Sequence, residues 1–232
     1  MNIDLSAAAY GLAVLLHVTL FAYWLGADLG VFYASRFVLR SDLPMESRMT
    51  ASAIQRFLDT SVRVSLVLVL PSGASLLTMA GGGRNGLTRV SLAIIWVFSL
   101  AWLALVLVER KLPGSGPGDS LRRIDGVIRA GLVVLLLALA IAGLVGASAM
   151  THFPWWINAK IGVYALCVAA GLALRLRGGP FRQAWQQLRL DGSTPEVEKT
   201  LQRRMSGSMP FVYAIWVLIL VAAFLGIVKS SM

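Results

Sequence analysis

Residues 130–149 read AGLVVLLLALAIAGLVGASA, a run without a single charged side chain. A helix needs about 20 mainly apolar residues to cross the roughly 30 Å of hydrocarbon in a bilayer. A run of this length and polarity is therefore typical of a transmembrane helix. The apolar character begins slightly earlier, so the sequence predicts a span over residues 127–149.

Further apolar runs of similar length occupy much of the remaining sequence. Hydrophobic residues make up 57% of the 232 residues and charged residues only 14%, a balance outside that of soluble domains. We therefore predict an all-α fold, a polytopic transmembrane helical bundle that forms a single integral membrane domain over residues 1–232. Its predicted spans are residues 6–33, 64–80, 90–108, 127–149, 155–174 and 210–228, six in all.

The basic residues indicate how this bundle is oriented. The connections between spans one and two, three and four, and five and six hold 17 of the 21 lysines and arginines. The positive-inside rule places these connections in the cytoplasm and both termini outside. We expect a multi-pass protein of the bacterial inner (cytoplasmic) membrane. Anionic lipid headgroups are the expected counter-charge for the net charge of +10, and no nucleic acid is expected, because the basic residues form short tracts rather than one basic surface.

Two cytoplasmic segments, residues 42–60 and 180–206, show amphipathic patterns. Phe181, Trp185 and Leu188 are spaced i, i+4 and i+7 with arginines around them, which predicts a helix lying along the membrane surface. A second short helix is predicted after Thr194, because proline fits the first helical position and acidic residues favour the helix N-terminus.

The first span contains two ionisable residues on one face. His17 lies roughly 15 Å into the span, and ionisable groups at that depth mark candidate functional sites. Asp28 lies eleven residues further along the same face, roughly 16 Å closer to the cytoplasm. We expect Asp28 to form a structural ion pair with Arg63 or Arg36, because charges at that depth are seldom left unpaired.

The second histidine and an unusual lysine lie near the fifth span. His152 is in the short outer connection before it, and Lys160 lies inside it. Neutral imidazole binds haem iron or copper, so His17 and His152 are candidate metal ligands; the alternative for His17 is a hydrogen bond between helices. Lys160 can pair with a haem propionate or an anionic substrate, and the alternative is a lysine that extends its amine outward to the membrane surface.

Two tracts resemble a known group of membrane proteins. Residues 16–26, LHVTLFAYWLG, in which His17 is followed seven residues later by Trp24, resemble the first-span pattern of the CopD and HemJ group. Residues 155–164, WWINAKIGVY, are similar to that group's later Trp-x-x-x-Lys span start. The group includes copper-resistance membrane proteins and the HemJ type of protoporphyrinogen oxidase. The resemblance implies b-type haem, with His17 as an axial ligand, Lys160 as a propionate or substrate contact, and Trp24 among the cofactor-binding residues.

Two classes of function follow from these observations. The first is a haem b membrane protein of redox or electron transfer, which exchanges electrons with quinone or another membrane redox subunit and is a candidate oxidoreductase whose catalytic residues the sequence does not identify. The second is a non-redox membrane protein, either a small transporter, including one for copper, or a structural subunit of a larger complex. The sequence leaves open whether the chain forms a homo-oligomer.

Overall fold

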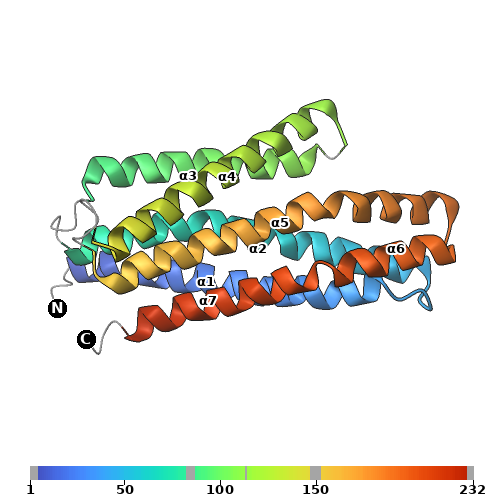
Figure 1. The fold of residues 1–232 in the computed structure, drawn as a ribbon, viewed down its shortest axis with the longest axis horizontal. Helices are drawn as coiled ribbons and strands as arrows, with labels where there is room; N and C mark the ends of the chain where they lie inside the picture. Colours follow the sequence, from blue (N-terminus) through green and yellow to red (C-terminus); the bar gives the residue numbers. More distant parts are fainter. Residues whose placement is uncertain (1–4, 82–86, 113, 147–152, 229–232) are drawn as a thin grey trace.

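The computed structural model describes residues 5–81, 87–112, 114–146 and 153–228, and these form helices joined by short connections (Figure 1). Six helices in these ranges are long and apolar enough to cross a membrane, the sixth being formed by α6 running into α7. The predicted all-α polytopic bundle is confirmed. The helices are α1 (Leu5–Val38), α2 (Met45–Gly81), α3 (Arg89–Lys111), α4 (Gly116–Leu144), α5 (Trp155–Asp191), α6 (Pro195–Ser206) and α7 (Met209–Val228).

The long helices run side by side, with the start of α1 and the end of α7 at the same end of the bundle (Figure 1). The most extensive packing joins α1 to α2 and α4 to α5, α7 packs chiefly on α5, and α1 and α7 touch only over a short stretch. The buried core includes Trp24 of α1, Val67 of α2, Trp102 of α3, Leu132 of α4 and Val168 of α5. Each helix except the short α6 therefore contributes one apolar stripe to a common hydrophobic core, and the rest of its surface is left for lipid.

Two helices are much longer than a membrane is thick. α2 and α5 have 37 residues each, so each is about 55 Å long, about 25 Å more than the hydrocarbon layer. Their extra length lies at the end opposite the two termini, beside α6 (Figure 1). Many of the arginines that the sequence placed in connections between spans therefore belong to continuous helices.

The projecting end of α5 forms a hairpin with α6. Its core consists of Ala184 and Leu188 of α5 and Val197 and Leu201 of α6, all buried, and Phe181 and Trp185 pack against it. The apolar stripe on residues 181–188 thus faces α6 rather than a lipid surface, contrary to the prediction, because two consecutive amphipathic helices cover each other's apolar faces. The predicted start of α6 is correct: Thr194 Oγ1 caps it by accepting the Val197 N–H at 3.4 Å.

An arginine from α2 joins this hairpin to the bundle. The Arg48 side chain is only 2% exposed and forms a two-pronged ion pair with Glu198 of α6, at 2.6 and 3.0 Å. Arg48 Nε also donates to the carbonyl of Val38 at the end of α1, at 2.9 Å. One guanidinium therefore connects α1, α2 and α6, and paired hydrogen bonds of this kind are the strong form of an ion pair.

This ion pair predicts a pH dependence of stability. Hydrogen bonds from Arg48 hold the pKa of Glu198, in the polar helix before the last span, below its usual value of 4.5. A carboxyl group with a lowered folded-state pKa contributes stability above its unfolded pKa and loses that contribution as the pH falls through the folded pKa. We expect the thermal unfolding temperature of purified protein to fall below about pH 4.5, and to fall less steeply in Glu198→Gln.

The matched control is Glu196→Gln, which changes an exposed carboxylate of the same helix. It should keep the pH profile of the unchanged protein. An equally steep loss of stability in Glu198→Gln would contradict the role assigned to this pair.

Candidate functional site

His17 lies on the face of α1 that packs against α2. Its Nδ1 is 2.8 Å from Ser72 Oγ, and the imidazole is half-buried. The next residue of α2 is Gly73, and a Cβ added there would lie 3.3 Å from His17 Cε1, tighter than an ordinary contact. The glycine therefore lets the imidazole lie close against the backbone of α2, one residue after the Ser72 hydroxyl that binds it.

The hydrogen bonds of Ser72 determine which imidazole nitrogen carries the proton. Ser72 Oγ donates to the carbonyl of Val69 at 3.0 Å. A hydroxyl has one proton to donate, so Ser72 Oγ accepts from His17 Nδ1–H. In the neutral imidazole the lone pair is then on Nε2, and a hydrogen bond on the other nitrogen is the usual way in which proteins orient ligating histidines.

Two further residues that the sequence marks as candidates, Trp24 and Lys160, lie on α1 and α5. Trp24 is buried in the core, and its ring meets that of Tyr164 of α5 edge to face, with centroids 6.3 Å apart. Lys160 extends toward α7, where a Cβ added at Gly226 would lie 2.8 Å from its Nζ. Trp24 thus forms part of the wall between α1 and α5, while the lysine lies at the contact of α5 with α7.

The second candidate ligand, His152, lies outside the described residues. Within the ranges that the structure describes, no three or more His, Cys, Asp or Glu side chains are grouped as a metal site. His17 is therefore the one histidine among the described residues.

Asp28 does not pair with Arg63 or Arg36, so the predicted structural ion pair is wrong. Its carboxylate accepts the indole N–H of Trp216 of α7, with Oδ2 and Nε1 2.7 Å apart. Arg63 instead donates to Asp59 at 2.9 Å, since a partner four residues earlier on the same helix needs no reach between helices. Arg36 lies over the Phe32 ring, 4.7 Å from its centroid.

A buried ion-pair network joins α3, α4 and α5. Asp125 of α4 is fully buried and accepts from Trp102 Nε1 at 2.7 Å, Arg129 Nε at 2.9 Å and Arg175 at 3.0 Å. Arg175 of α5 also pairs with Glu109 of α3 at 3.1 Å. Buried charges are costly unless they are paired and hydrogen-bonded, and here each one has a partner from another helix or from the preceding turn.

A second set of ion pairs continues this network toward α2. Asp59 accepts from Arg63 at 2.9 Å and from Arg110 of α3 at 2.5 Å. The ion pairs around Asp59 and Asp125 were not predicted from the sequence, because these arginines were assigned to connections between spans. The signal was present as opposite charges four residues apart, Asp59 with Arg63 and Asp125 with Arg129, a spacing that places them on one helix face.

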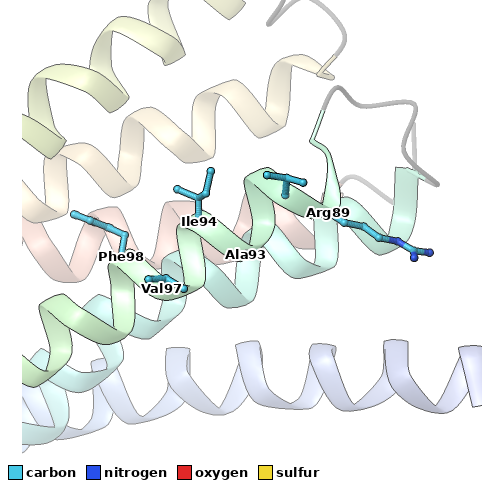
Figure 2. A pocket seen from close by; sticks show the side chains of 6 residues that line it. Arg89, Ala93, Ile94, Val97 and Phe98 are labelled. Atoms are coloured by element: carbon cyan, nitrogen blue, oxygen red, sulfur yellow. The ribbon is translucent and has the colours of Figure 1, made fainter.

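Two surface pockets lie on the described part of the chain away from His17. The first follows one face of α3 and is apolar apart from an arginine at its end (Figure 2), as expected of a surface that faces lipid acyl chains; it is lined by Arg89, Val90, Ala93, Ile94, Val97 and Phe98. The second is a partly polar groove between the end of α5 and α6. The first lacks the grouped polar side chains that orient a small substrate; the second has polar side chains in its lining, among them Gln183, Gln187 and Glu196.

No protein-family model, no curated protein and no solved structure matches this chain. The function is therefore inferred from the arrangement of the side chains.

Proposed function

We propose that this integral membrane protein binds b-type haem through His17 and acts in membrane redox or electron transfer. The observation that carries the proposal is the chain of hydrogen bonds from His17 Nδ1 to Ser72 and on to the Val69 carbonyl. It fixes the orientation of the imidazole and, in the neutral form, places the lone pair on Nε2, as an axial haem ligand requires. The resemblance of residues 16–26 and 155–164 to the CopD and HemJ group points to the same cofactor.

The haem group, when bound, supplies one-electron exchange between the ferric and ferrous states. The protein would contribute His17 as the iron ligand, Ser72 to orient it and Trp24 as part of a dry wall that excludes water from the bundle centre. Lys160 carries a positive charge suited to a carboxylate on the cofactor or on an anionic substrate. The expected electron partners are membrane quinone or a neighbouring redox subunit, and a haem-dependent oxidoreductase activity would follow from such a site.

A non-redox membrane protein, either a small transporter or a structural subunit, is the competing proposal. It is favoured by the ion pairs that join α2, α3, α4 and α5, which explain the buried arginines with no chemistry. Pro71, which lies inside α2 next to the serine that binds His17, adds support for transport, since interrupted helices line the sites of many transporters. A copper transporter would use the same Nε2 lone pair.

Absorption spectra of the purified protein separate these proposals. With haem bound, the oxidised protein should show a Soret band, and reduction with dithionite should produce a sharp α-band. Extraction into acidified solvent should return about one haem per chain. A colourless, folded preparation with no extractable haem would overturn the haem proposal, and metal analysis of that preparation would test for copper.

We also propose that the arginine-rich ends of the helices face the cytoplasm of a bacterial cell and that both termini face outward, on the strength of the charge asymmetry. The chain has one cysteine, Cys167, which is buried. In a Cys167→Ala background, a membrane-impermeant maleimide added to spheroplasts should label Leu5→Cys at the outer end of α1. It should label Ser120→Cys, at the other end of the bundle, only after the cells are broken. The reverse pattern would invert the orientation.

A further inference from the structure

Asp28 differs from every other carboxylate inside the described part of the bundle. Asp59, Glu109 and Asp125 each pair with at least one arginine. The half-buried carboxylate of Asp28 accepts one hydrogen bond, from the neutral indole of Trp216. This acid therefore lacks the counter-charge that its neighbours have, although it lies about 15 Å from the cytoplasmic end of α1.

The side chains around Asp28 do not supply a positive charge. From α2, the charged side chain that acts on its carboxylate is Asp59, which has the same sign and whose own charge is compensated by Arg63 and Arg110. From α7, it meets Trp216, whose ring lies 5.3 Å from that of Phe32. An ionised Asp28 would thus face aromatic rings and a second carboxylate.

The charged and titratable residues elsewhere on these elements are engaged with other groups. On α1, the guanidinium of Arg36 lies over Phe32, two turns from Asp28, and His17, three turns the other way, binds Ser72. On α7, Tyr213 packs against Trp216, with ring centroids 5.5 Å apart. Among the described residues, Asp28 therefore has no positively charged partner on these three helices, and its hydrogen-bond donor is the neutral Trp216 N–H.

We propose that Asp28 is a proton-binding site inside the bundle, which takes up a proton from the cytoplasmic side in mildly acidic conditions and releases it to that side as the pH rises. Burial without a counter-ion and a neighbouring carboxylate both disfavour the ionised form, and an ionisable residue at this depth is a candidate functional group. The proton balance is simple: the carboxylate and one proton from the cytoplasmic side form the carboxylic acid. The proposal goes beyond haem binding and does not depend on it.

Infrared spectroscopy of the protein in lipid vesicles tests this proposal directly. A protonated carboxyl group has a C=O stretching band that an ionised one lacks, and the band shifts in D2O. At pH 5 we expect such a band from Asp28 in the unchanged protein and its loss in Asp28→Asn. The control is Asp42→Asn, which alters an exposed carboxylate paired with Arg40 at 2.6 Å and should leave the band unchanged.

A titration and a second variant complete the test. Raising the pH should abolish the band in the unchanged protein, with no substitution needed. Trp216→Phe removes a donor that favours the ionised carboxylate, so the band should persist to a pH higher by about one unit. Identical C=O regions in the unchanged protein and Asp28→Asn at pH 5 would overturn the proposal, as would a band that appears only when sodium is removed, because Asp28 would then be a cation ligand. These bands do not require haem, so the haem proposal can fail separately.

Discussion

Replacing Asp125 with alanine should destabilise the protein by about 3 to 5 kcal/mol, the cost of removing one partner from a buried ion pair. Asp125 accepts from Arg129, Arg175 and the Trp102 indole at once. Without it, the guanidinium of Arg129, only 4% exposed, keeps no carboxylate partner, and Arg175 retains only Glu109. These charges cannot move into water without separating α4 from α3 and α5.

The measurement is thermal or denaturant unfolding of the purified protein in one detergent. Asp125→Asn should be less damaging than Asp125→Ala, because the amide oxygen still accepts one hydrogen bond although the charge is lost. Asp119→Ala, at an exposed position of the first turn of the same helix, should cost less than about 1 kcal/mol. If Asp125→Ala unfolded at the same temperature as Asp119→Ala, the network would not be a main source of stability.

Replacing His17 with alanine should abolish the haem spectrum that we propose for this protein. The chain has only two histidines, and His17 lies on α1 within the helical bundle. Ser72→Ala should have a smaller effect, a loss of about 10 to 100-fold in haem affinity, as is usual when the residue that orients a ligating histidine is removed. Haem content per chain and the reduced-minus-oxidised spectrum measure both effects.

A matched control keeps this experiment interpretable. His152→Ala changes the other histidine and shows whether it is a second ligand, in which case the α-band should shift or weaken. His17→Ala should still elute as a folded protein, because Trp24 and Leu20 continue to anchor α1 in the bundle. A full haem spectrum in folded His17→Ala would contradict the assignment of His17 as the ligand.

The sequence could predict the helices because their signals are local. The uncharged run at residues 130–149 contains enough apolar surface to specify a span without reference to any other part of the chain. The start of α6 was predictable in the same way from Thr194 and the proline that follows it. The length of α2 and α5 was not predictable, because the polar residues beyond the apolar runs gave no sign that each helix would continue past the membrane-spanning segment.

The sequence by itself determined that six apolar helices form, that basic residues gather at one end of them, and that His17 and Asp28 lie within the first. Only the tertiary structure decided that Ser72 binds His17, that Trp216 binds Asp28 and that Arg175 binds Asp125. Length and polarity are properties of each segment alone, whereas these pairs depend on the rotation and depth of one helix relative to another. One residue of sliding moves a side chain about 1.5 Å along the axis and about 100° around it, so the choice of partner is made when the helices pack.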